Sequence, residues 1–314
     1  MFVFSVLRPA RKILSIVGSC QTRVRVTDVV ACIGRRLSLR LVCLLLISIF
    51  STGCATPAYQ KVDKRAQELG FVRSTQGGGE FRHVVYSPSR ETQGDSVHVY
   101  IEGDGVAWQW RYFIKADPTP KRALMLDLMG QDKGNTLYVG RPCYFGLAVD
   151  EQCNPNYWTY SRFSEKVVNS MATVIAHRTK DFDKVVLIGH SGGAALALLI
   201  AEKLQKAAAV VTVAGNIDTD AWISHHKYTP LFDSLNPADR APLPASIKQL
   251  HLVGSIDRVV PPELARNWLS RQHSAEVWYV DGNTHVCCWA EQWPAVLQWI
   301  ESIEDGSGFS SAAR

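Results

Sequence analysis

The sequence has little of what several common classes of protein require. It contains no low-complexity tract and no internal repeat, and its composition, 46% hydrophobic and 20% charged, is that of a globular protein. It has no C-x-x-C pair and no histidine spacing typical of a metal site. The apolar run at residues 41–50 is too short to span a bilayer. We therefore expect one large globular domain that uses no metal and no other cofactor.

The sequence also lacks a basic excess outside its first residues. The whole chain carries 34 Lys and Arg against 29 Asp and Glu, a formal net charge of +5. Residues 1–53 hold eight of these bases and only one of the acids, which leaves a net charge of −2 for the remainder. A body of this charge does not indicate a nucleic-acid partner.

The basic residues at the start belong to a segment that predicts export. Arg35, Arg36 and Arg40 precede the apolar run at 41–50, whose length suits the core of a signal peptide. Small residues then precede Cys54, as in a bacterial lipobox, although Ser51 stands where an aliphatic residue is usual. We expect residues 1–53 to be a leader and Cys54 to be the lipidated first residue of a mature protein in the cell envelope, facing the periplasm. Ordinary signal cleavage and an uncleaved anchor are the alternatives.

The body alternates strand-like and helix-like segments over residues 81–303, after a polar stretch at 54–80 that we interpret as a linker. Short apolar runs rich in β-branched residues predict strands, and longer amphipathic runs predict helices. The predicted strands are 82–86 (an edge strand), 96–101, 135–140, 185–188, 209–214, 247–253 and 275–280. This alternation predicts an α/β fold with a mostly parallel central sheet and helices on both faces.

Two segments depart from the alternation. Residues 215–246 hold four prolines and several aromatic residues, and they are too long for an ordinary connection, so they predict a small cap insertion. The adjacent His225 and His226 in this insertion point in different directions and lack a third ligand, which favours a lining or surface role over a metal site. The Gly- and Ser-rich residues 304–314 are expected to form a disordered tail.

The stretch at 185–196 carries the main functional signal. A buried strand, Val185 to Ile188, leads into Gly-His-Ser-Gly-Gly at 189–193, and a strong helix former follows. The pattern G-x-S-x-G in this context is typical of a nucleophile elbow, which holds a serine at the carboxyl end of a strand. We therefore predict that Ser191 is a nucleophile; a glycine-rich turn without chemistry is the alternative.

Two further strand ends supply the partners that a serine nucleophile needs. A serine hydroxyl requires a base that takes its proton, and the base requires an orienting carboxylate. Asp257 follows the strand at 247–253, and His285 follows the strand at 275–280, in the order nucleophile, acid, histidine. Asp218 is a rival acid after the preceding strand, and Asp281 is a weaker rival because it lies so close to His285 in sequence.

The cysteines of the body indicate disulfide bonds. An exported protein meets an oxidising compartment, and four cysteines lie beyond residue 54. Cys143 and Cys153 bracket a short loop and form a natural pair. The adjacent Cys287 and Cys288 are harder to assign, because neighbouring cysteines rarely bridge each other, and their pairing stays open.

Together these motifs resemble the α/β-hydrolase superfamily, and in particular exported bacterial members with lipoprotein signals. The resemblance covers about residues 81–303 and rests on five short segments, which are GDG at 103–105, RPC at 141–143, GHSGG at 189–193, GSIDRVVPP at 254–262 and THVCCW at 284–289. It implies the triad Ser191, His285 and Asp257. It also implies an oxyanion hole formed by the N–H of Gly192 with that of Asp104 or Gly105. The sequence EGDG replaces the HGGG of one lipase class, so that class is not implied.

These observations favour a serine hydrolase that cleaves an ester, thioester or amide through an acyl-enzyme. The expected substrate is a small molecule or an acyl group, and the expected membrane contact is the N-terminal lipid. The alternative is an envelope binding protein that keeps the fold and has lost catalysis, which a serine-reactive probe would not label. A purely structural lipoprotein is a weaker alternative, since it would not need an ordered Ser, Asp and His.

Overall fold

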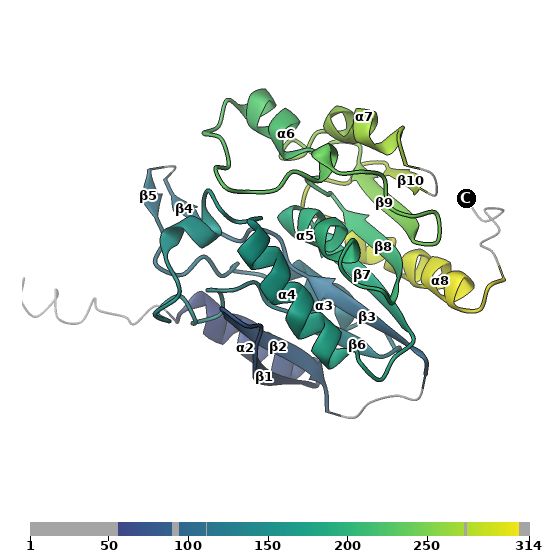
Figure 1. The fold of residues 1–314 in the computed structure, drawn as a ribbon, viewed down its shortest axis with the longest axis horizontal. Helices are drawn as coiled ribbons and strands as arrows, with labels where there is room; N and C mark the ends of the chain where they lie inside the picture. The colour runs from purple at the N-terminus through teal and green to yellow at the C-terminus, as the bar shows by residue number, and fades with distance from the viewer. Residues whose placement is uncertain (1–55, 90–93, 111, 273–274, 308–314) are drawn as a thin grey trace, which may run out of the picture. The chain divides into compact units, whose positions relative to one another are not determined.

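An eight-stranded sheet organises the chain in this computed structural model, which describes residues 56–89, 94–110, 112–272 and 275–307 (Figure 1). The strand order is β1-β2-β6-β3-β7-β8-β9-β10. All neighbours from β6 to β10 pair in parallel, whereas β1 with β2 and β2 with β6 are antiparallel. The strands are β1 (Phe71–Gly77), β2 (Arg82–Pro88), β3 (Ser96–Ile101), β6 (Thr136–Val139), β7 (Lys184–His190), β8 (Ala207–Val213), β9 (Lys248–Gly254) and β10 (Ala275–Val280). A separate two-stranded ribbon consists of β4 (Trp108–Gln109) and β5 (Phe113–Ile114).

Helices cover both faces of this sheet (Figure 1). On one face the apolar residues of the sheet pack against α2 (Ala58–Glu68), α3 (Leu124–Met129) and α8 (Trp293–Glu304). On the other face they pack against α4 (Glu165–Arg178), α5 (Gly192–Ala201) and the short α7 (Arg266–Leu269). Every residue of α5 is buried, which accounts for its almost wholly apolar sequence. Four 3₁₀ turns complete the described elements: η1 (Pro155–Trp158), η2 (Pro237–Asp239), η3 (Pro262–Ala265) and η4 (Trp289–Glu291).

The predicted fold class is confirmed. The sheet is mostly parallel, its two faces carry helices, and residues 215–246 form an insertion between β8 and β9 that contains α6 (Thr219–His226) and η2. The parallel pairing has a direct consequence for the site. Because parallel strands end at the same edge of a sheet, the segments that follow β3, β7, β9 and β10 meet there.

The linker prediction for residues 54–80 is wrong. Residues 58–68 form α2, and residues 71–77 form β1, which takes the edge position that the sequence analysis gave to residues 82–86. The three glycines at 77–79 lie at the hairpin turn between β1 and β2, where Gly78 N donates to Phe81 O. The sequence signal is weak because α2 buries only Val62 and Ala66, and β1 is mostly exposed along its length. Backbone pairing with β2, rather than apolar burial, holds β1 in place.

The two ends of the chain are only partly described. Residues 1–53 and Cys54 lie outside the described residues, as do the final residues 308–314. The predicted tail begins too early, because Glu304 is the last residue of α8 and accepts hydrogen bonds at 2.9 Å from His98 and, at its carbonyl, 2.5 Å from Lys184. Within the described segments no helix combines the length and the apolar character needed to cross a membrane.

A buried ionic cluster fixes the C-terminal helix to the middle of the sheet. His98 of β3 contacts Asp132 through Nδ1 at 2.6 Å and Glu304 of α8 through Nε2 at 2.9 Å, and Tyr100 donates to the same Asp132 at 2.5 Å. Burial by itself lowers the pKa of His98, but the hydrogen bonds to the two carboxylates outweigh burial and raise this pKa to about 9. The imidazole is therefore charged at neutral pH and donates from both nitrogens.

This cluster predicts a loss of stability at alkaline pH. Because the pKa of His98 is raised in the folded protein, its contribution is fully present below about pH 6.5 and is lost as the pH rises through about 9. The shift corresponds to about 3 kcal/mol. We expect the free energy of unfolding, measured with urea, to fall by about this amount more in the parent than in His98→Gln between pH 6 and pH 9.5. Equal pH dependence in the two proteins would contradict the assignment.

Candidate active site

Ser191 lies on a tight turn between β7 and α5. Its backbone has φ 53° and ψ −120°, an unfavourable conformation for a residue with a side chain. The turn closes because Gly193 lies against the carbonyl oxygens of Ile101 and Glu102, where a Cβ would overlap backbone atoms. Ser191 N donates to Val213 O at 2.9 Å, which ties the turn to the end of β8. The local pattern read from the sequence as a nucleophile elbow thus has the geometry of one.

A chain of hydrogen bonds joins the three predicted residues. The hydroxyl of Ser191 donates to His285 Nε2 at 2.9 Å, and His285 Nδ1 donates to Asp257 Oδ2 at 2.9 Å. The second carboxylate oxygen of Asp257 accepts from the backbone N–H groups of Val259 at 2.8 Å and Val260 at 2.9 Å. These bonds fix the imidazole tautomer, with the proton on Nδ1 and the lone pair of Nε2 accepting from the serine hydroxyl.

The environment keeps Asp257 charged and His285 neutral. Burial alone would raise the pKa of Asp257, but the hydrogen bond from His285 and the two backbone donors outweigh burial and lower it. For His285 burial dominates and lowers the pKa, against the opposing hydrogen bond to Asp257, and the neighbouring His190 lowers it further. A neutral imidazole beside an ionised carboxylate is the state that accepts a proton from a serine.

The two rival acids lie elsewhere. Asp218 caps the N-terminus of α6, where its side chain accepts from Ala221 N at 3.0 Å. Asp281 accepts from the hydroxyl of Ser255 at 3.0 Å. Of the three candidate carboxylates, Asp257 is therefore the one that the fold brings to His285.

Two side chains that the sequence analysis missed hold the backbone of His285. His190 Nε2 donates to the carbonyl oxygen of His285 at 2.8 Å, and Trp289 Nε1 donates to the same oxygen at 3.2 Å. The loop from His285 to Trp289 contains a disulfide between Cys287 and Cys288, the pairing that the sequence left open. His190 directly precedes Ser191 in the motif, and its ring centre lies 4.9 Å from that of His285. The position of His190 next to Ser191 was the one feature of the sequence that pointed to a place in the site.

Asp104 contributes more than a backbone N–H to this edge of the sheet. Its carboxylate forms ion pairs with Arg141 and, at 2.7 Å, with Arg162, and both arginines are buried. Burial alone would raise the pKa of Asp104, but the two guanidinium groups outweigh it and lower the pKa to about 2. The carboxylate also lies against the backbone of Gly192, where a side chain at residue 192 would overlap it. The loop after β3 and the first residue of α5 are thus in direct contact beside Ser191.

The predicted oxyanion residues differ in their surroundings. Gly192 is the first residue of α5, so its N–H has no acceptor within the helix. Gly105, with φ +64°, lies instead against the carbonyl of Pro118, where only a glycine fits. Asp104 is therefore the residue of the loop that the fold places against Gly192.

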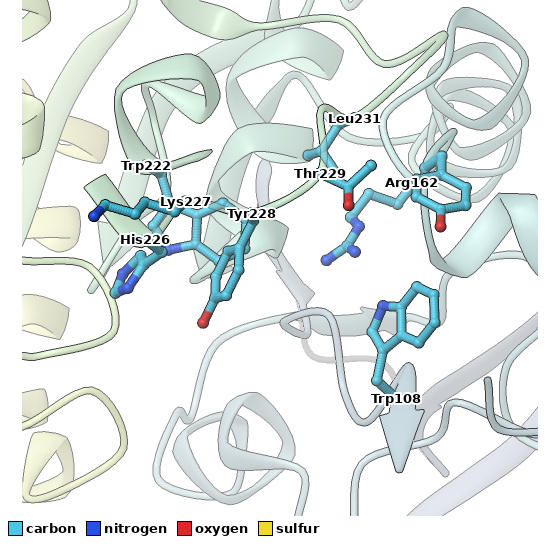
Figure 2. A pocket seen from close by; sticks show the side chains of 9 residues that line it. Trp108, Arg162, Trp222, His226, Lys227, Tyr228, Thr229 and Leu231 are labelled. Carbon is cyan, nitrogen blue, oxygen red and sulfur yellow. The ribbon is translucent and has the colours of Figure 1, made fainter. Parts of the chain in front are cut away.

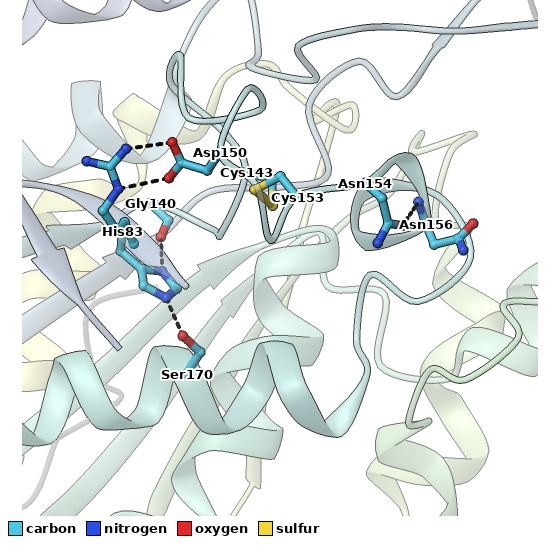
Figure 3. Close-up of a disulfide and its surroundings, with 9 residues drawn as sticks. His83, Gly140, Cys143, Asp150, Cys153, Asn154, Asn156 and Ser170 are labelled. Carbon is cyan, nitrogen blue, oxygen red and sulfur yellow. Dashed lines mark hydrogen bonds and ion pairs between the residues drawn. A yellow bond between two sulfur atoms is a disulfide. The ribbon is translucent and has the colours of Figure 1, made fainter. Parts of the chain in front are cut away.

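A disulfide supports the loop that carries Arg141. The structure joins Cys143 to Cys153, with the sulfur atoms 2.06 Å and the Cα atoms 5.6 Å apart (Figure 3). Near this bond, His83 of β2 donates from Nδ1 to the carbonyl of Gly140 at 2.9 Å and accepts from Ser170 of α4 at 2.7 Å (Figure 3). Burial lowers the pKa of His83 to about 4, so this imidazole is neutral and structural.

Comparison with known proteins agrees with this geometry. The model of the serine hydrolase family FSH1 matches residues 149–287, which is under half of the chain but includes Ser191, Asp257 and His285. An esterase of Pyrococcus furiosus has 14% sequence identity and a TM-score of 0.54, over 76% of this chain and 93% of that one. A proline iminopeptidase of Mycobacterium smegmatis has 9% identity and a TM-score of 0.54, over 75% of this chain and 100% of that one. No curated protein matches the sequence.

The chain has the α/β-hydrolase fold. The structural matches show the shared fold, and the family match makes the protein a serine hydrolase. In the described part of this hydrolase, no three His, Cys, Asp or Glu side chains are grouped so that they could hold a metal ion. His226 instead donates from Nε2 to the carbonyl of Val259 at 2.8 Å.

A cavity of about 490 Å³ lies between the insertion and the segment that carries Tyr160 and Arg162 (Figure 2). One side belongs to the insertion, and Trp222 and His226 of α6 both donate to Val259 O, two residues from Asp257. The other side includes Arg162, whose partner Asp104 lies against Gly192. Both sides are therefore bonded to loops that carry site residues. The cavity is lined by Trp108, Tyr160, Arg162, Trp222, His226, Lys227, Tyr228, Thr229 and Leu231.

The geometry predicts a histidine that resists protonation. We expect the imidazole of His285 to titrate below pH 6.5, because burial disfavours its charged form. The Asp257→Asn change should lower this pKa further, since it removes the charge that opposes burial. NMR titration of ¹⁵N-labelled histidines measures both values, and His285→Gln identifies the signal. A pKa above 6.5 in the parent would contradict this account.

Proposed function

We propose that this serine hydrolase cleaves an ester, thioester or amide through an acyl-enzyme on Ser191. The observation that carries the proposal is the unbroken chain of hydrogen bonds from the Ser191 hydroxyl through His285 to Asp257. Each member is oriented by other bonds of its own, so the arrangement does not depend on a bound substrate. Such preorganisation supports catalysis rather than a binding role alone.

In the first half of the reaction, the oxygen of Ser191 attacks the substrate carbonyl while His285 Nε2 takes its proton. Asp257 holds the imidazole in place and stabilises the imidazolium that forms. His285 then gives the proton to the leaving group, and the acyl-enzyme remains. In the second half, water attacks the acyl group while His285 takes a proton from that water. His285 then gives this proton to the Ser191 oxygen as the bond between that oxygen and the acyl group breaks.

The negative oxygen of the intermediate needs two donors. We assign them to the backbone N–H groups of Gly192 and Asp104, because these two residues are in contact beside Ser191. The positive end of the α5 dipole also favours negative charge there. The two guanidinium groups leave a net positive charge around the Asp104 carboxylate, which acts in the same direction.

An ester is the first substrate to test. Esters have better leaving groups than amides, and the structural relatives include both an esterase and a peptidase. We therefore propose a screen of p-nitrophenyl esters of graded chain length, with purified protein of residues 55–314. A fluorophosphonate probe, which reacts with an activated serine, detects the nucleophile before any substrate is known.

The triad assignment predicts a graded loss of activity. Ser191→Ala should abolish turnover and probe labelling, and it should leave the fold intact because the side chain makes no capping bond to α5. Asp257→Asn should reduce kcat by about 10⁴, since it leaves the imidazole without its orienting partner. Steady-state kinetics on the best ester measure both effects.

Asp218→Asn is the matched control for Asp257→Asn. Asparagine caps a helix as well as aspartate does, so this variant should keep kcat within about threefold of the parent. A large loss in Asp218→Asn together with a mild effect of Asp257→Asn would move the acid to residue 218. Full turnover by Ser191→Ala would contradict the mechanism itself.

We also propose that the hydrolase is exported and held on the membrane by lipid at Cys54. The support is the order of basic residues, apolar run, small residues and cysteine at 35–54. The net charge of −2 beyond residue 53 offers no attraction to anionic lipid. Stable attachment through lipid alone needs more than one acyl chain, which a diacylated cysteine provides.

The lipid proposal is tested on the full chain in a bacterial host. Cys54→Ser should leave the membrane fraction or accumulate as an uncleaved precursor, while the activity of the folded domain stays unchanged because the domain begins at α2. Metabolic labelling with an alkyne fatty acid should mark the parent and not Cys54→Ser. An unlabelled parent with a mature N-terminus at another residue would leave a secreted, unlipidated enzyme.

A further inference from the structure

The cavity between the insertion and Arg162 has a distinctive chemistry. Its lining includes the aromatic side chains of Trp108, Tyr160, Trp222 and Tyr228, and none of its nine lining residues is acidic. The positive charge of Arg162 is shared with Arg141 against a single carboxylate, that of Asp104. The cavity thus combines apolar aromatic walls with an excess of positive charge. Its volume of about 490 Å³ is ample for a ring-bearing ligand.

Among the described residues, Arg162 has one donor group without a protein partner. Its side chain is only 9% exposed, its Nη1 donates to Asp104 at 2.7 Å, and its Nε donates to Thr159 O at 2.5 Å. In the described part of the chain, no acceptor is bonded to Nη2. Figure 2 shows the guanidinium end of Arg162 pointing into the space between Tyr228 and Trp108. A guanidinium nitrogen that faces a cavity and has no protein acceptor favours an anionic acceptor from a ligand, because a hydrogen bond between two charged groups is stronger than one between neutral groups.

The aromatic walls determine what the rest of the ligand is. Trp108 and Tyr160 meet edge to face with ring centres 6.1 Å apart, and Trp222 and Tyr228 do the same at 5.0 Å. Trp222 is also fixed by its bond of 2.7 Å to Val259 O. These rings present flat apolar surfaces from both sides of the cavity, which suit a planar aromatic group.

We infer that the cavity binds an aromatic ring that carries a carboxylate, with the carboxylate on Arg162 Nη2. The inference rests on the proposed function, since it names the substrate class as an ester with such a ring in its acyl or alcohol part. The carboxylate replaces the missing acceptor of Arg162, and the ring fills the space between the aromatic walls. A neutral aromatic ester would offer this nitrogen only an uncharged acceptor, which makes a weaker hydrogen bond to a guanidinium group than a carboxylate does, so the site discriminates between the two.

The experiment measures binding in a protein that cannot react. Isothermal titration of Ser191→Ala with naphthalene-2-carboxylate and naphthalene-2-carboxamide compares an anion with a neutral ligand of the same shape. We expect the carboxylate to bind about tenfold more tightly. Adding Arg162→Lys should reduce this preference to about twofold or less, because a single ammonium drawn to Asp104 lacks the second nitrogen of the fork.

Two further variants separate the parts of the site. Tyr228→Ala, at a half-exposed position that tolerates change, should weaken both ligands and keep the ratio between them. Arg240→Lys is the matched control, since Arg240 is an exposed arginine paired with Glu202 outside this cavity, and it should keep the full preference. If Arg162→Lys does not fold, the ratio in Ser191→Ala and the response to Tyr228→Ala still decide the outcome.

Several results would overturn the inference. The first is equal binding of the two ligands or no binding of either, and the second is a carboxylate preference that survives in folded Arg162→Lys. The third is tighter binding of glucuronate, a carboxylate without an aromatic ring, than of naphthalene-2-carboxylate. Failure of the proposed function has a different readout, which is the absence of fluorophosphonate labelling of the parent. Labelling without carboxylate preference overturns only the cavity assignment, and carboxylate preference without labelling overturns only the hydrolase mechanism.

Discussion

The carboxylate of Asp104 is the group on which the arrangement of the site depends. It lies against the backbone of Gly192 and binds Arg141 and Arg162, so one side chain connects the elbow, the disulfide-supported loop and the cavity. A carboxylate that is only 19% exposed would be costly without such partners, and removing either one would leave charge unpaired. Because the two guanidinium groups lower its pKa to about 2, Asp104 stays ionised while His285 titrates. The ion pairs of Asp104 with Arg141 and Arg162 therefore do not depend on whether His285 is protonated.

The loop of His285 is held at two points for two different purposes. Asp257 binds the ring and selects the tautomer, whereas His190 and Trp289 bind the carbonyl and set the position of the backbone. The loop of Asp257 is in turn connected to the insertion through Val259, which accepts from Trp222 and His226. The insertion and the loop of Asp257 are therefore joined at the carbonyl oxygen of Val259.

The parts of the fold that were predicted well are those with strong local signals. The core strands are short runs of β-branched residues, and the buried α5 is almost wholly apolar, so burial and sequence agree there. The edge of the sheet was predicted poorly for the opposite reason. β1 and α2 are largely exposed and polar, and their positions depend on backbone pairing and on a few buried side chains. Hydrophobic patterning carries little information about such elements.

The sequence by itself determined the α/β architecture and the order of Ser191, Asp257 and His285, because each lies directly after a recognisable strand. Only the tertiary structure decided which carboxylate reaches the histidine, and that Arg141 and Arg162 converge on Asp104. These contacts join residues 28 to 58 positions apart, and that of His190 with the His285 carbonyl spans 95. A side chain that bonds across such distances leaves no periodic trace in its neighbourhood. Its partner is set by how the strands align at one edge of the sheet.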